Sequence, residues 1–264
     1  MFLTVLLTCS LLGCIAGFLA GLLGIGGGLV IVPALIYMLP SLGFENDHIM
    51  TVAIATSLAS IVFTSASASF AHQKNSNIPW PIAKQLMVMI AFGALLGAYS
   101  ADSLSNELLT NIFAIAVAIL ATYMLLSIRV VKSKPIPNSW VIKVIGFGVG
   151  GISSIMGIAG GAILVPILTY YSMSIREAIG TATVCGFVVA CFGALGFIIT
   201  GLDQGNLPPW CLGYIYLPAL LGIISTSSLF APLGVKMAEK LPVRYLKRFF
   251  AGFLILVAIK MLLQ

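Results

Sequence analysis

The sequence predicts an all-α polytopic membrane protein, and three observations support this. Of the 264 residues, 60% are hydrophobic and only 8% are charged, whereas about one quarter are charged in a soluble domain. Strands of a membrane barrel would alternate polar and apolar positions, but stretches such as 112–126 are apolar on all sides. A membrane-spanning helix needs about 20 apolar residues, and most of the intervals that lack Asp, Glu, Lys, Arg and His reach that length. These intervals are 1–44, 49–71, 85–101, 108–128, 144–175, 178–202 and 204–235.

An internal repeat divides the chain into two halves. Residues 13–37 align with 146–170, and ten of these 25 positions are identical. Further along, Ala55-Thr56-Ser57 aligns with Gly180-Thr181-Ala182. We therefore predict one integral membrane domain, which consists of a first repeat (1–128), a basic cytoplasmic linker (129–143) and a second repeat (144–264).

The loop charges predict how the segments cross the membrane, because Lys and Arg gather in cytoplasmic loops. The basic loops at 74–84, 129–143 and 236–248 are predicted inside, and the loops with Asp or Glu but no Lys or Arg outside. The predicted sides of all these loops are consistent with the number of membrane crossings only if 144–175 is a broken hairpin. Such a hairpin enters the membrane and returns to the same face. Each half is then a glycine-broken helical hairpin plus three transmembrane helices. An odd number of crossings makes the halves inverted-topology repeats, an arrangement found in secondary transporters.

Two glycine-rich segments interrupt the first helix of each predicted hairpin: Gly24-Ile25-Gly26-Gly27-Gly28 and Gly157-Ile158-Ala159-Gly160-Gly161. Such runs break a helix and leave bare backbone N–H groups at the start of the next one, which together with the helix dipole form an anion site. The alternative is that the glycines merely let helices pack closely. Because the motif occurs twice at equivalent positions, we favour a substrate site that includes Gly26, Gly27, Gly28, Gly160 and Gly161.

Hydroxyl groups in the following helices are the other candidate substrate ligands. Thr56, Ser57, Thr181 and Thr183 lie inside apolar spans, and their hydroxyls can donate to a bound anion. The alternative for each is a hydrogen bond to a neighbouring helix or to a carbonyl of its own helix. Thr56 and Thr181 are favoured because the repeat aligns them.

The sequence contains no recognisable catalytic, metal or cofactor site. No acidic or basic residue lies deep in a span, so coupling through a buried carboxylate is disfavoured. His48 and His72 lie at span ends, where exposed interfacial histidines are expected, and His72 is the candidate if the protein itself carries a proton. The net charge of +6 follows from the basic loops. The predicted partners are therefore the lipid bilayer and a small anion, with no nucleic acid, and a homo-oligomer is left open.

These motifs resemble the TauE/SafE sulfite exporter family of membrane permeases. The resemblance rests on the two glycine segments, on Pro33 and Pro166, and on the aligned Thr56 and Thr181, and it covers about residues 5–263. It implies a bacterial inner-membrane or eukaryotic protein that exports sulfite, sulfoacetate or other sulfur-containing or organic anions, with the glycine segments and the following threonines bordering the substrate. Ala159 departs from the first repeat, which has Gly26 there.

The hypothesis is therefore a secondary transporter that exports a small anion, such as sulfite or an organosulfonate, across the cytoplasmic membrane, and not an enzyme. A passive anion channel or a permease for another small organic anion is the alternative. A membrane-embedded enzyme or a scaffold is disfavoured by the missing catalytic groups and the short loops.

Overall fold

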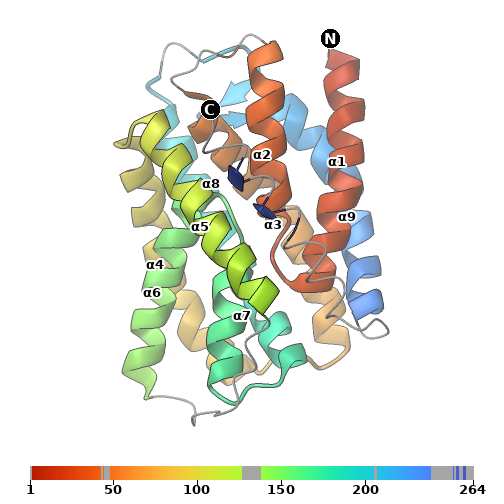
Figure 1. Ribbon diagram of the computed structural model, residues 1–264, viewed down its shortest axis with the longest axis vertical. Helices are drawn as coiled ribbons and strands as arrows, with labels where there is room; N and C mark the ends of the chain where they lie inside the picture. Colours follow the sequence, from red (N-terminus) through yellow and green to blue (C-terminus); the bar gives the residue numbers. More distant parts are fainter. Residues whose placement is uncertain are drawn as a thin grey trace.

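The computed structural model describes residues 2–42, 44, 48–126, 138–204, 207–238, 252, 254–255 and 258–259. Most of these residues are helical, and seven of the helices are long and apolar enough to cross a membrane. The long helices form one bundle (Figure 1). The prediction of an all-α polytopic membrane protein is confirmed.

The helices follow the two predicted halves. The first half contains α1 (Phe2–Leu23), α2 (Gly28–Met38), the short 3₁₀ helix η1 (Leu39–Leu42), α3 (Ile49–Lys74), α4 (Trp80–Asp102) and α5 (Asn106–Leu126). The second contains α6 (Ser139–Met156), α7 (Gly161–Tyr170), α8 (Ile175–Gly201), β1 (Cys211–Leu212), β2 (Ile215–Tyr216) and α9 (Leu217–Ala238). Residues 129–137 of the linker and 239–248 of the last basic loop lie outside the described residues, and the division into 1–128, 129–143 and 144–264 stays a prediction.

Both predicted broken hairpins are present. α1 ends at Leu23, and α2 carries the chain back, so that Thr8 near the start of α1 donates to the sulfur of Met38 at the end of α2 (3.6 Å). In the second half, Ile142 of α6 and Ile167 of α7 line the same small apolar hollow. Each hairpin therefore returns to the end of the molecule at which it entered.

The two halves exchange packing partners. α1 packs along α9 and α6 packs along α4, while α3 and α8 contact each other in the centre. Glycines allow the close approach: a Cβ on Gly17 would overlap the backbone of Ser227 in α9. One on the equivalent Gly150 would overlap the backbone of Ile90 in α4. Gly17 and Gly150 occupy equivalent positions of the repeat, and both allow the helices to pack closely.

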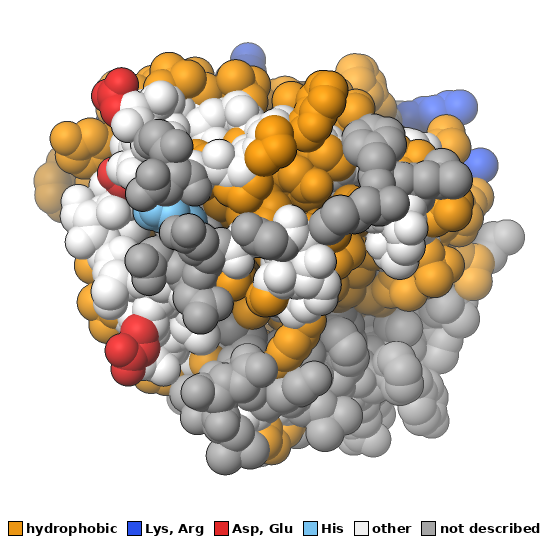
Figure 2. Space-filling view, turned by 90° about the horizontal axis from the view of Figure 1, so that it is seen from above, with side chains coloured by type: hydrophobic (Ala, Val, Ile, Leu, Met, Phe, Trp, Pro, Cys, Tyr) orange, Lys and Arg blue, Asp and Glu red, His pale blue; other side chains and the backbone are white. Residues whose placement is uncertain are grey.

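The two ends of the bundle differ in charge. Asn77, in the loop after α3, contacts Gly180 near the start of α8. The end of α3, the start of α4 and the start of α8 therefore lie at one end of the bundle. At the other end, the Tyr214 hydroxyl donates to Asp102 (2.7 Å). Figure 2 shows acidic side chains and a histidine on this second end. The first end carries Lys74, Lys84, Lys143, Arg176 and Lys236 together with Glu177, and the second carries Asp102, Glu107 and Asp203.

The hairpins enter from opposite ends. α1 runs in the same direction as α9 and starts at the acidic end, because Gly13 lies against Ile223 and Gly21 against Ala231. α6 runs in the same direction as α4 and starts at the basic end (Figure 1). An inverted repeat requires this arrangement. The side of the membrane on which each end lies does not follow from this packing, so the inverted-topology repeat stays a prediction.

Candidate substrate site at the crossing of the two breaks

The two helix breaks lie directly against each other. A Cβ on Gly28 would overlap the carbonyl oxygen of Gly157, and a Cβ on Gly161 would overlap that of Gly24. Gly28 is equivalent to Gly161 in the repeat, and Gly24 to Gly157, so the two contacts are reciprocal. Between them, a Cβ on Gly26 would overlap the methyl group of Ala159. The predicted site glycines are therefore brought together, and the breaks meet backbone to backbone.

Glycine is required by the backbone conformation here as well as by space. Gly26 and Gly27 have φ values of +72° and +82°, and Gly157 and Gly160 have +67° and +73°. This left-handed region is costly for residues with a Cβ. Ala159, the departure from the first repeat, is not among the residues with positive φ, so an alanine is accommodated there.

Each break ends at an uncapped helix N-terminus. Gly27 precedes α2 and Gly160 precedes α7, and neither helix has a side-chain cap. The carbonyl of Gly160 accepts from the N–H groups of Ile163 and Leu164, so the N–H groups of Gly161 and Ala162 precede the first helical bonds of α7. The same pattern holds at Gly27 in α2. Such N–H groups are natural donors to an anion.

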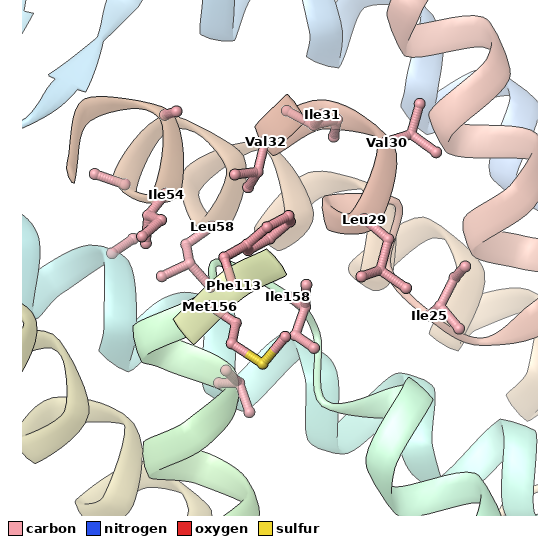
Figure 3. Close-up of a cluster of buried hydrophobic side chains, with 14 of the residues drawn as sticks. Ile25, Leu29, Val30, Ile31, Val32, Ile54, Leu58, Phe113, Met156 and Ile158 are labelled. Atoms are coloured by element: carbon pink, nitrogen blue, oxygen red, sulfur yellow. The ribbon is translucent and has the colours of Figure 1, made fainter. Parts of the chain in front are cut away.

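The electrostatic consequence follows from the helix dipoles. The N-termini of α2 and α7 each carry the equivalent of about +0.5 charge, and the C-termini of α1 and α6, on the other side of each break, carry about −0.5 each. An anion is therefore favoured only locally, at the N–H groups of α2 and α7. The surroundings are apolar, since Phe113 of α5, Leu58 of α3 and Ile158 are fully buried around the crossing (Figure 3). A low dielectric strengthens the attraction of an anion to these dipoles. The crossing therefore offers backbone N–H donors in an apolar surrounding.

Two of the four predicted hydroxyl residues reach the breaks. Ser57 donates to the carbonyl oxygen of Gly157 across the two halves (2.8 Å). The Thr183 hydroxyl lies 3.4 Å from the position of a Cβ on Gly24, although it donates to the carbonyl of Ile179 in its own helix (2.8 Å). Both residues are buried. Ser57 thus joins the breaks, and Thr183 stands beside them.

The other two hydroxyls are engaged by loops. Thr56 accepts a hydrogen bond from the N–H of Tyr216 in β2 (3.0 Å). Thr181 donates to the sulfur of Met173, in the turn between α7 and α8 (3.9 Å). The repeat aligns these threonines, but the loops that fold against them are not related in sequence. Their hydroxyls are therefore occupied in this state of the protein.

Loops from both ends enclose the crossing. At the acidic end, β1 and β2 form a short hairpin whose Tyr214 and Ile215 are buried. At the basic end, Asn77 contacts Gly180, and Ile78 packs with Val184 of α8. Each loop thus packs against α3 or α8 within a few turns of that helix's start. The residues of both breaks are buried, so the crossing is closed to solvent in this structure.

Three residues differ from the expectations of the sequence. His72 was expected to be an exposed interfacial histidine, and this is wrong: it is buried at 3% exposure, because the end of α3 packs with α9. Ser153 and Ser154, two residues that precede the second break, are fully buried and were not among the predicted ligands. Adjacent hydroxyls in an apolar helix, where the first half has Ala20 and Gly21, were the signal for them.

The seven apolar helices of membrane-spanning length, with paired breaks at the crossing of two hairpins, define a multi-pass membrane protein. The family model described as sulfite exporter TauE/SafE matches residues 9–261. The chain belongs to that family.

Its relatives support the same class. A probable membrane transporter protein of Haemophilus influenzae is 43% identical over 99% of both chains. One from Methanocaldococcus jannaschii is 25% identical over 99% of this chain and 97% of its own. A third, YunE of Bacillus subtilis, is 26% identical over 72% of this chain and 77% of its own. No solved structure matches the chain significantly. The protein is therefore a multi-pass membrane transporter and not an enzyme.

Proposed function

We propose that this transporter is a secondary transporter that exports a small anion, with sulfite or an organosulfonate as the first candidates. The observation that carries the proposal is the reciprocal contact of Gly28 with Gly157 and of Gly161 with Gly24. It brings the N-termini of α2 and α7 to one buried point, where their N–H groups can donate to an anion. The family description, sulfite exporter, agrees with an anion of this kind.

The enclosing loops suggest how access alternates. Release of the β1–β2 hairpin from Thr56 would open the site towards the acidic end, and movement of the 75–79 loop away from Gly180 would open it towards the basic end. A carrier opens these routes one at a time around a fixed site. The closed arrangement favours a carrier over the alternative of a passive anion channel.

The dipoles also favour a charge state. The N-termini of α2 and α7 offer N–H donors but no full positive charge, and the C-termini of α1 and α6 lie beside them. A dianion would therefore keep more uncompensated charge in this apolar surrounding than a monoanion would. Burial of an uncompensated charge is costly. We infer that sulfite is transported as the singly protonated bisulfite. Organosulfonates, whose sulfonate group carries one negative charge, fit the same site.

The test is reconstitution of the purified full chain in proteoliposomes. Uptake or efflux should be measured for sulfite, sulfate, thiosulfate, sulfoacetate and taurine, with empty liposomes as the control. We expect transport of sulfite or of a sulfonate in preference to sulfate. Preference for sulfate, or no transport of any of these anions, would reject the proposed substrate class.

Counterflow separates the carrier from the channel. Liposomes preloaded with unlabelled substrate should accumulate labelled substrate transiently if the protein is a carrier. A channel would let the labelled and unlabelled anions equilibrate without this overshoot and with no saturation. The expected result is a saturable overshoot.

A further inference from the structure

The side chain of Ser153 is fully buried and lacks a hydrogen-bond partner within the described part of the chain. Its oxygen lies 3.0 Å from the position that a Cβ on Gly160 would occupy. Gly160 is the residue before α7, whose N–H groups at Gly161 and Ala162 precede its first helical bonds and have no side-chain cap. A buried hydroxyl without a partner is costly, so its presence at this point calls for an explanation.

The first half has no such group. The position equivalent to Ser153 is Ala20, and the position equivalent to Gly160 is Gly27, which faces the methyl and carbonyl groups of Ala16. Gly27 and Gly160 share a positive φ, although Gly26 has one and its equivalent, Ala159, does not. The hydroxyl therefore makes the two halves of the crossing chemically unequal.

We propose that the Ser153 hydroxyl is a direct ligand of the transported anion, and that with the first N–H groups of α7 it selects head groups with three oxygen acceptors, such as sulfite and sulfonates. This inference rests on the proposed function and specifies its site. The two N–H groups and one O–H provide three donors at one helix start. A sulfonate has a separate oxygen for each of them, whereas a carboxylate has two oxygens in one plane, one of which would have to accept two of the three bonds.

The neighbouring Ser154 is a matched control. It is also fully buried and without a partner among the described residues. Successive residues of a helix point about 100° apart, and the Ser154 oxygen faces α8, 2.7 Å from the position of a Cβ on Gly193. Loss of the Ser154 hydroxyl therefore removes an equally buried group that faces away from the start of α7.

The experiment compares Ser153→Ala, Ser154→Ala and the wild type in proteoliposomes, with methanesulfonate and acetate as matched substrates. A hydrogen bond to a charged group is worth enough to change an affinity by about tenfold or more. We expect Ser153→Ala to raise the KM for methanesulfonate about tenfold and to change the KM for acetate much less. Ser154→Ala should have the same KM values as the wild type. Because Ser153→Ala removes an unpaired buried hydroxyl, its melting temperature in detergent should equal or exceed that of the wild type.

The outcomes separate this inference from the proposed function. Wild-type liposomes that move neither anion, nor sulfite, would reject the proposed function. Wild-type transport with an unchanged KM ratio in Ser153→Ala would reject the inference alone. A lower melting temperature together with equal losses for both anions would make Ser153 a structural residue and would also overturn it.

Discussion

The Cα of Gly161 lies so close to the carbonyl oxygen of Gly24 that a single methyl group on Gly161 would overlap that oxygen. The same relationship joins Gly28 to Gly157. These four residues hold the two breaks together without side chains. Transport should therefore be sensitive to even a small addition at these glycines.

Substitution of the crossing glycines tests this contact. Gly28→Ala and Gly161→Ala should abolish or nearly abolish transport, because overpacking at a backbone contact costs about 1–3 kcal/mol and shifts the breaks apart. Gly148→Ala is the control, since a Cβ on Gly148 would meet nothing within 4 Å. The measurements are uptake in proteoliposomes and the yield of monodisperse protein. Normal uptake by both crossing variants would leave the glycines without a role in transport.

The larger substitutions Gly27→Leu and Gly160→Leu test conformation as well as space. Both glycines have positive φ, so a leucine would be strained in either break and would also fill the start of the following helix. We expect folded protein in the membrane, measured by fluorescence-detected chromatography, but no transport. Transport at the wild-type rate by both variants would contradict the site.

The inverted repeat predicts opposite sides for equivalent loops. In a background without the five native cysteines, cysteines at Ser103 and at Lys240, which lies outside the described residues, should be labelled by an impermeant reagent from opposite faces of the membrane. The physical reason is that a half with an odd number of crossings reverses every loop of the next half. Labelling of both positions from one face would remove the inverted repeat.

The β1–β2 hairpin should act as the gate at the acidic end. Tyr214→Phe removes the hydrogen bond to Asp102, and Thr56→Val removes the acceptor for the N–H of Tyr216. An intramolecular hydrogen bond contributes about 0.5–1.5 kcal/mol, and about 1.5–3 kcal/mol when one partner is charged, so each change should increase the open population at least about twofold. A cysteine at Ile215, which is 3% exposed, should react correspondingly faster with a water-soluble thiol reagent.

Thr122→Val is the matched control for the hairpin variants. Its hydroxyl donates only to the carbonyl of Ala118 in its own helix (2.8 Å) and is exposed, so reactivity at Ile215 should not change. The Tyr214 hydroxyl should also keep its proton at mildly alkaline pH, because burial, and then the bond to Asp102, raise the pKa of Tyr214. Unchanged reactivity in both hairpin variants would show that the hairpin is not a gate.

Coupling is predicted to depend on the substrate's own proton. The described spans have no acidic side chain in their interior, so His48→Asn and His72→Asn should keep the pH profile of transport, and its midpoint should follow the pKa of the supplied anion. His72 is the stronger test, because it is buried and its ring nitrogens have no partner among the described residues. A flattened profile for several anions in His72→Asn would show that the protein carries the proton.

The sequence by itself determined the membrane class, the spans, the two breaks and the repeat. All of these depend on properties local to the chain: apolar length, loop charge and glycine density. They do not depend on how the helices pack. In lipid, a helix must form all its backbone hydrogen bonds within itself, and a run of glycines interrupts the helix wherever it occurs.

Only the tertiary structure decided which hydroxyls face the crossing. Thr56 and Ser57 are adjacent, yet one meets the hairpin and the other reaches Gly157, because neighbouring helical residues point about 100° apart. Ser153 and Ser154 separate in the same way. A helix's own pattern marks its polar positions, but the element packed against each face, often from the other half of the chain, determines which of them meet the substrate.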